Sequence, residues 1–294
     1  MTEGTALVLE GGGYRGIFTA GVLDVFMERG LYDFNSVWGT SAGSLAATSF
    51  RSRQIGRTMR IMLAFRDDKR LISVFSLAKH GDITGGEFLY HDVQDTLDPC
   101  DLDVFNNNPT RMFCTVSDMV FGSARYLEVR HLPEDVEMIH ASSAIPLVSH
   151  PIEIDGHRYL DGGTCDSMAV EPALGLIQPE EVEDFGGAER AVVVLTRERT
   201  YVKDNKIEKM AVLSRRYAEY PLYVQALNNR AKNYMRTREL IFELEKEGRV
   251  LVIEPPGAVS VTASEHVGAP LLDLYLKGRR AAEKRFAEIV AFLG

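Results

Sequence analysis

Ser41 is the residue whose neighbours most clearly suggest chemistry. It stands in the pentapeptide Gly39-Thr40-Ser41-Ala42-Gly43, which fits the pattern G-x-S-x-G, after the apolar pair Val37-Trp38 and before a helix-forming run. A strand, a tight turn and a helix in this order are typical of a nucleophile elbow, which exposes a serine hydroxyl at the end of a strand. The same serine could also be an ordinary helix N-cap. The pattern therefore makes Ser41 a candidate nucleophile.

A glycine-rich loop precedes the elbow. The segment Gly11-Gly12-Gly13-Tyr14-Arg15-Gly16 lies between the apolar run 6–9 and a helix-like stripe that starts at Ile17. Its spacing also fits a dinucleotide-binding fingerprint, which needs an acidic residue after the second strand, about 20 residues on. The nearest acid, Asp33, precedes the second apolar run instead. The loop is therefore better suited to stabilise an anion through its backbone N–H groups, as an oxyanion hole does, and no cofactor is expected.

A third polar turn, Asp161-Gly162-Gly163, follows a predicted β-hairpin over 152–160 with the preferred turn Asp155-Gly156. Asp161 could simply form the turn, or its carboxylate could take the proton of a serine nucleophile. The chain has seven histidines, and none lies in a motif that would pair it with Ser41. Asp161 is therefore the favoured base.

The elements that must hold these motifs alternate between strands and helices. Apolar runs predict strands at 6–9, 112–116, 124–129, 191–195 and 250–253, and apolar stripes predict helices from 17 to 30, after Pro133, on either side of Pro221 and from 271 to 293. Such alternation predicts a parallel sheet with right-handed crossovers, which brings the loops after successive strands to one edge. We expect an α/β fold with three α/β/α layers and a mainly parallel central sheet.

The composition fits one globular domain over residues 1–294, with the motifs within about 6–175 and residues 190–294 packing on the same unit. The net charge of -9 argues against general nucleic-acid binding. Three cysteines without paired spacing and the isolated acids Asp101 and Asp103 indicate neither a disulfide framework nor a metal site. The N-terminus lacks the features of a signal peptide, and no apolar run approaches ~18 residues. We expect a cytoplasmic protein with at most peripheral membrane contact.

Two further features have two interpretations each. Residues 51–70 are locally basic, and Arg53, Arg57 and Arg60 would share one face of a helix, either as a solvated surface or as a docking surface for anionic lipid head groups. Large apolar residues could line a substrate pocket or simply fill the core. These are Phe18, Phe65, Phe75, Leu77 and Phe88.

Taken in order, the three motifs resemble those of the patatin-like phospholipase family. The matches are G-G-G-x-R-G at 11–16, G-x-S-x-G at 39–43 and D-G-G at 161–163. The segment Ala144-Ile145-Pro146, Tyr275 and Gly278 also resemble that family. The resemblance therefore extends over nearly the whole chain.

The resemblance implies a hydrolase of the phospholipase A, lysophospholipase or esterase type that cleaves acyl-ester lipids through an acyl-enzyme. Ser41 resembles the nucleophile and Asp161 the base of a dyad without histidine, while the loop with Arg15 resembles the oxyanion hole. Many relatives have a proline where this chain has Ala169, so the resemblance does not predict the shape of the loop after Asp161. Similarity to bacterial members implies a compact unit without appended ankyrin or membrane domains, and the oligomeric state stays open. The alternative is a catalytically weak lipid-binding or regulatory protein on the same fold.

Overall fold

The computed structural model describes residues 2–68, 70, 86, 88–180, 182, 187–204 and 206–294. These residues form an eight-stranded sheet with the order β5-β6-β3-β2-β1-β7-β8, and β4 pairs with β3. The strands are β1 (Thr2–Leu9), β2 (Ser36–Thr40), β3 (Arg111–Asp118), β4 (Ser123–Val129), β5 (Ile152–Ile154), β6 (His157–Asp161), β7 (Ala188–Val194) and β8 (Val250–Ile253). Five of them, β3-β2-β1-β7-β8, are parallel, whereas β4, β5 and β6 are joined by antiparallel pairings.

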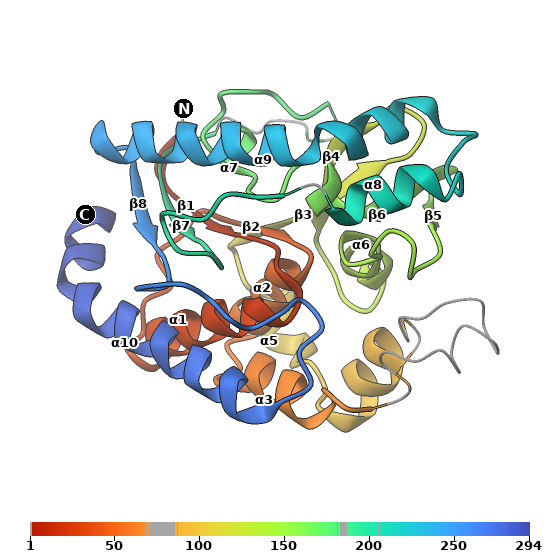
Figure 1. Ribbon diagram of the computed structural model, residues 1–294. Helices are drawn as coiled ribbons and strands as arrows, with labels where there is room; N and C mark the ends of the chain where they lie inside the picture. The colour runs from red at the N-terminus through yellow and green to blue at the C-terminus, as the bar shows by residue number, and fades with distance from the viewer. Residues whose placement is uncertain are drawn as a thin grey trace.

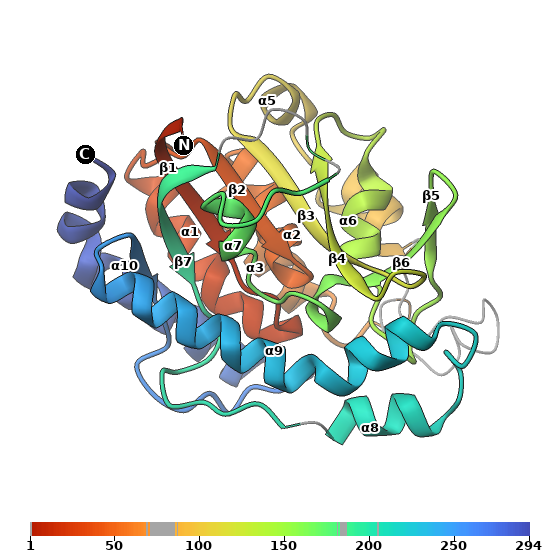
Figure 2. The same cartoon turned by 90° about the horizontal axis from the view of Figure 1, so that it is seen from above.

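Helices cover both faces of this sheet, as Figure 1 shows. On one side lie α1 (Ile17–Glu28), α2 (Ala42–Arg51), α3 (Arg57–Ala64), α5 (Leu102–Asn106) and α10 (Gly268–Leu293). On the other lie α7 (Val170–Ala173) and α9 (Pro221–Lys246), with α8 (Lys206–Leu213) beside α9, and Figure 2 shows α9 running across the strands. The short helix α6 (Val136–Ser142) packs beside β3 and β6, and η2 (Phe88–Leu97) is a π-helical segment. The expected three-layer α/β/α fold with a mainly parallel sheet is confirmed.

The alternation of side chains along the strands divides the core into two layers. Leu7 and Leu9 of β1 pack in the cluster under α1, α2 and α10, while Ala6 and Val8 pack in the cluster under α7 and α9. Successive side chains of a strand point to opposite faces, so a strand buried on both faces must be apolar throughout. That is why these strands read as continuous apolar runs.

The register of β3 brings two strand ends together. One edge of β3 pairs with β4 along its length. The other edge pairs first with β2, as far as Thr40 opposite Thr115, and then with β6, from Asp161 opposite Val116. Because β2 is parallel and β6 antiparallel to β3, the carboxyl ends of β2 and β6 meet there. Ser41, the residue after β2, therefore lies beside Asp161.

Most predicted elements are confirmed, with small shifts at their ends. The hairpin of β5 and β6 turns at Asp155 and Gly156, both at positive φ, and Pro221 begins α9. Pro133 lies in the turn before α6 rather than at the first helical position, since that helix begins at Val136. The turn-rich sequence of residues 81–88 predicts a loop, but most of these residues lie outside the described part of the chain.

The basic segment 51–70 does not form the predicted arginine face. Arg53 precedes α3, which begins at Arg57. The Arg57 side chain is buried and donates to Asp98 O and Gln94 Oε1, while Arg60 forms an ion pair with Asp98 at 2.9 Å. Arg57 and Arg60 thus join α3 to the segment after η2, and the three arginines do not form one exposed face.

Within the described parts of the chain, every helix is too short or too polar to traverse a lipid bilayer.

Candidate active site

Ser41 occupies the sharp turn between β2 and α2. Its backbone angles are φ 55° and ψ −122°, a conformation that costs a residue with a side chain on the order of 1–3 kcal/mol. The helix after the turn passes very close to β1, because a Cβ atom on Gly43 would lie 2.3 Å from Leu9 O. Gly39 is the residue of β2 opposite Leu9 and Cys114. The strained turn and the close approach are those of a nucleophile elbow.

The Ser41 hydroxyl donates a hydrogen bond of 2.6 Å to Asp161 Oδ2. The other carboxylate oxygen, Oδ1, accepts from the N–H of Gly163 at 2.7 Å. Both side chains are nearly buried, since Ser41 and Asp161 are each 7% exposed. Burial raises the pKa of Asp161, against the opposing effects of the hydrogen bonds from Ser41 and Gly163. A short bond between a hydroxyl and a desolvated carboxylate can transfer the proton that a serine nucleophile must lose.

Ser142, at the end of α6, holds the elbow in place. Its Oγ accepts from the backbone N–H of Ser41 at 3.0 Å and donates to Thr115 O of β3 at 2.7 Å. The same Oγ lies 2.8 Å from Ser44 Oγ in the first turn of α2. This hydroxyl therefore joins three elements behind Ser41. Sequence reasoning missed it, because a serine in the helical run 136–142 carries no local signal of a long-range contact.

The glycine-rich loop approaches Ser41 directly. A Cβ atom on Gly11 would lie 2.9 Å from Thr40 O and 3.1 Å from Ser41 Cβ. Gly13 has φ +56°, and the loop continues as a single 3₁₀ turn, η1 (Gly13–Gly16), into α1. The amides of Gly11, Tyr14 and Arg15 donate to carbonyl oxygens of Ser167, Ala263 and Gly12 respectively. The amides of Gly12 and Gly13 are left as the candidate donors to an anion at Ser41.

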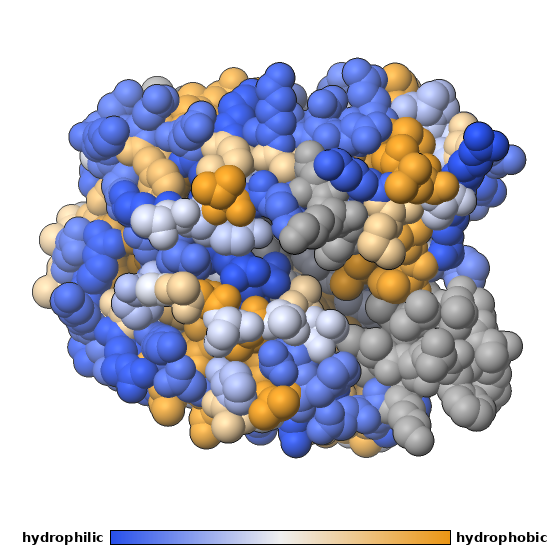
Figure 3. Space-filling view, in the orientation of Figure 1, coloured by the Kyte–Doolittle hydropathy of each residue, from blue (hydrophilic) through white to orange (hydrophobic). Residues whose placement is uncertain are grey.

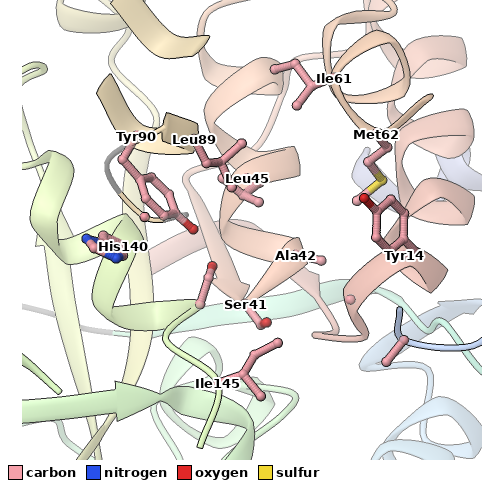
Figure 4. A pocket seen from close by; sticks show the side chains of 14 residues that line it. Tyr14, Ser41, Ala42, Leu45, Ile61, Met62, Leu89, Tyr90, His140 and Ile145 are labelled. Carbon is pink, nitrogen blue, oxygen red and sulfur yellow. The ribbon is translucent and has the colours of Figure 1, made fainter. Parts of the chain in front are cut away.

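An apolar cavity of about 130 Å³ opens on one side of Ser41. Figure 4 shows Ser41 at its margin, with Leu89 and Tyr90 of η2 on one wall and Tyr14 and Met62 on another. Leu45, Ile61 and Ile145 also line it. A hydrocarbon chain is the kind of group that such walls bind, because its burial removes apolar surface from water.

A larger, polar cavity of about 490 Å³ opens on the other side. It shares Gly13, Ser41, Ile145 and Ala263 with the apolar cavity. Its remaining walls include charged residues of segment 197–204, of α8 and of α9. Segments 197–204 and 259–263 cross the front of the molecule in Figure 1, and hydrophilic side chains predominate on this face in Figure 3. Ser41 therefore stands at the junction of an apolar and a polar compartment.

A family model described as patatin-like phospholipase matches residues 7–174, which is more than half of the 294 residues. The chain belongs to the patatin-like phospholipase family. A second model, described as a domain of unknown function (DUF6363), matches residues 220–294.

Two relatives illustrate how far the similarity to other patatin-like proteins extends. The chain is 31% identical to the uncharacterized protein YjjU of Escherichia coli (strain K12) over 173 residues, which are 57% of this chain and 48% of YjjU. It is 28% identical to the uncharacterized NTE family protein Rv1063c of Mycobacterium tuberculosis (strain ATCC 25618 / H37Rv), over 58% of this chain and 46% of that protein. The chain spans about half the length of these relatives.

Among solved structures, VipD from Legionella pneumophila matches 98% of this chain and 67% of its own, with a TM-score of 0.49 and 14% identity.

The remaining predictions about the patatin-like site have different outcomes. Phe18 is part of the core under α1, and the rings of Phe65 and Phe88 meet edge to face. None of the three lines the apolar cavity. Phe75 and Leu77 lie outside the described residues. Gly162 begins the turn η3 (Gly162–Thr164) after Asp161, and Ala169 is buried just before α7. The loop after Asp161 is thus a compact turn that packs on the sheet.

In the part of the chain that the structure describes, no histidine hydrogen bonds to Ser41 or Asp161, and His80 lies outside that part. His140 lines the apolar cavity, but its Nδ1 faces Glu137 Oε2 at 3.1 Å. No group of three or more histidine, cysteine, aspartate or glutamate side chains that could bind a metal ion is found among the described residues.

Proposed function

We propose that this chain is a serine acyl hydrolase that cleaves carboxylic esters of lipids through a Ser41–Asp161 dyad. The observation that supports this most strongly is the 2.6 Å hydrogen bond from Ser41 Oγ to Asp161 Oδ2 at a strained elbow. Membership of the patatin-like phospholipase family supports the same reaction class. The two compartments at Ser41 suit a substrate with one apolar and one polar part.

In the acylation step, Asp161 Oδ2 takes the hydroxyl proton as Ser41 Oγ attacks the ester carbonyl carbon. The amides of Gly12 and Gly13 are the proposed donors to the oxygen that becomes negative, and losing one such donor typically costs ~10²–10³ in rate. Collapse of the tetrahedral intermediate breaks the bond to the alcohol oxygen. That oxygen leaves with the proton that Asp161 held. The acyl group stays on Ser41 as an ester.

In the deacylation step, water enters the place of the alcohol and gives a proton to Asp161 as its oxygen attacks the acyl carbon. The intermediate then releases the fatty acid, and the proton returns to Ser41 Oγ. In our proposal the acyl chain lies between Leu45, Met62 and Leu89, and the alcohol part lies in the polar cavity. Each step uses the same carboxylate, so no histidine is required.

Replacement of Ser41 by alanine tests the proposal. Ser41→Ala should reduce hydrolysis of a p-nitrophenyl acyl ester to background, and a fluorophosphonate probe should label the wild-type chain at Ser41 but not the variant. Ser123→Ala, an exposed serine of β4, is the matched control and should behave as wild type. Undiminished turnover by Ser41→Ala contradicts the proposal. A folded wild-type chain that binds lipid but is neither labelled nor active favours a lipid-binding or regulatory role.

A further inference from the structure

The acidic residues of the polar cavity are already bound by groups of the protein. Glu10 accepts from the N–H of Thr196 and from the Tyr234 hydroxyl, each at 2.5 Å. Glu208 forms an ion pair with Arg230 at 2.5 Å, and Arg230 also donates to Gly163 O. Asp161 is bonded as described above, and Asp204 has an interaction of its own within the chain. These carboxylates therefore have partners without any ligand.

Three cations of the same cavity are differently placed. Within the described residues, the buried Nε atoms of Arg15 and Arg197 have no hydrogen-bond partner. The Lys203 ammonium lies 5.0 Å from the centroid of the Tyr234 ring, and no ion pair with Lys203 occurs among the described residues. The Arg197 guanidinium donates from Nη1 to Val259 O at 2.9 Å, so only its Nε is left without an acceptor. Burying a charged donor without an acceptor is unfavourable, and an anion in the cavity would reduce that penalty.

Burial and neighbouring cations shift the titration of two of these groups. Burial lowers the pKa of Lys203 to about 8, and the neighbouring Arg230 and Arg15 contribute in the same direction. Burial and the neighbouring Arg197 also lower the pKa of Arg15. Glu10 and Glu208 oppose the shift at Lys203 but do not cancel it. The cations thus repel one another across the cavity.

We infer that Arg15, Arg197 and Lys203 form a subsite for an anionic head group on the alcohol side of the ester, and that this subsite selects lipids with a terminal phosphate. The inference rests on the proposed function, because it assigns the polar cavity to the alcohol part of the substrate. A phosphate monoester offers three acceptor oxygens to these donors. An uncharged glycerol head group has no charge for these donors to bind, and a phosphocholine brings a further cation into a cavity that these three cations and Arg230 already line. Arg15 comes from the glycine loop and Lys203 from the segment after β7, so two segments far apart in the sequence contribute.

Three substrates with the same acyl chain test the subsite: 1-acyl-glycerol-3-phosphate, 1-acyl-glycerol and 1-acyl-glycerol-3-phosphocholine. The wild-type chain should show a kcat/KM for the phosphate at least roughly tenfold above both others, as expected for hydrogen bonds to a charged group. Lys203→Gln should lower that preference roughly tenfold, whereas Lys203→Arg, which keeps the positive charge, should retain most of it. Lys209→Gln removes a lysine from the exposed surface of α8 and should keep the preference.

Equal kcat/KM for the three lipids, or an unchanged preference in Lys203→Gln, overturns the subsite while leaving the hydrolase intact. Binding to Ser41→Ala protein, measured by calorimetry, separates the two proposals further. Tighter binding of 1-acyl-glycerol-3-phosphate than of 1-acyl-glycerol, lost with Lys203→Gln, supports the subsite even if no lipid is hydrolysed. Equal binding of the two lipids overturns the subsite whatever the hydrolytic activity.

Discussion

Two requirements on Asp161 oppose each other. As a base it must be ionised, yet burial at the end of β6 raises its pKa above the ordinary 3.8. A carboxylate in that setting is a stronger proton acceptor than an exposed aspartate, which suits the transfer from Ser41. The same burial makes its charged form unfavourable for folding. The residue should therefore contribute to activity and reduce stability at neutral pH.

Asp161→Asn separates these effects. The amide can still accept from Gly163 N–H and donate to Ser41 Oγ, but it cannot take a proton, so hydrolysis should fall by ~10²–10⁴. Because the folded-state pKa is raised, the folded chain holds this proton more tightly than the unfolded chain. The stabilisation from a neutral carboxyl is then lost as pH rises through the folded-state pKa. At pH 7 the variant should melt at the same temperature as wild type or higher, in calorimetric scans.

Wild-type turnover should also decline on the acid side at a pH above the range of an ordinary aspartate. The decline should appear in kcat/KM for a neutral ester, whose own ionisation does not change. A variant that melts well below wild type at pH 7, or an acid limb at the pH of an exposed aspartate, would contradict this account of Asp161.

At the level of elements, the proposed catalytic pair depends on two strands that meet end to end. The sequence predicted β2, the hairpin of β5 and β6, and the turns that carry Ser41 and Asp161, because each has a local signal in apolar runs and turn residues. It could not predict that β2 and β6 share one edge of β3, since strand neighbours are set by packing of the whole sheet. The roles of Ser41 and Asp161 stay predictions until they are measured.

The same distinction explains which site residues sequence reasoning missed. Ser142, Lys203 and Arg230 reach the site from α6, from the segment after β7 and from α9. Each lies in a segment whose local pattern is an ordinary helix or loop. Arg57 is the opposite case. Its helical spacing with other basic residues predicted an exposed side chain, whereas the structure buries that side chain against Asp98 and Gln94. Long-range contacts of polar side chains have no local signature.

Ser142→Ala tests the contact between α6 and the elbow. It removes the acceptor of the buried Ser41 N–H and the donor to Thr115 O. An unsatisfied buried group costs ~1–3 kcal/mol, so the free energy of unfolding should fall by that order. The nucleophile should also lose its fixed position, and kcat should fall more than KM rises. Ser123→Ala again serves as control. Unchanged kcat together with unchanged stability would show that α6 does not position Ser41.

At the scale of the whole molecule, the C-terminal quarter completes the fold around the site. The second family model begins at residue 220, just before α9. Yet β8 pairs with β7 in the common sheet, and α10 packs along α1, which follows the glycine loop. Tyr275 of α10 donates to the buried Asp24 at 2.8 Å, and Gly278 touches the backbone of Phe18. We predict that these parts unfold as one domain.

Gly278→Ala tests that prediction with a probe in each part. A Cβ atom at Gly278 would lie 2.1 Å from Phe18 O, so α10 must move away from α1. Such overpacking typically costs ~1–3 kcal/mol, which exceeds the gain of about 1 kcal/mol from alanine in a helix.

Trp38 is the chain's single tryptophan and is buried in β2, so its fluorescence reports on the region of the patatin-like motifs. Far-UV circular dichroism reports largely on long helices such as α9 and α10. If the chain is one domain, both signals of Gly278→Ala should change at the same midpoint temperature. That midpoint should lie a few degrees below the wild-type value, since ~1 kcal/mol moves Tm by about 2–4 °C at this size. Lys284→Ala, on the exposed side of α10, should leave both midpoints in place.

If Gly278→Ala lowers the helical midpoint but leaves that of Trp38 unmoved, residues 220–294 form a separate unit, and the residues of α9 at the polar cavity belong to a second domain.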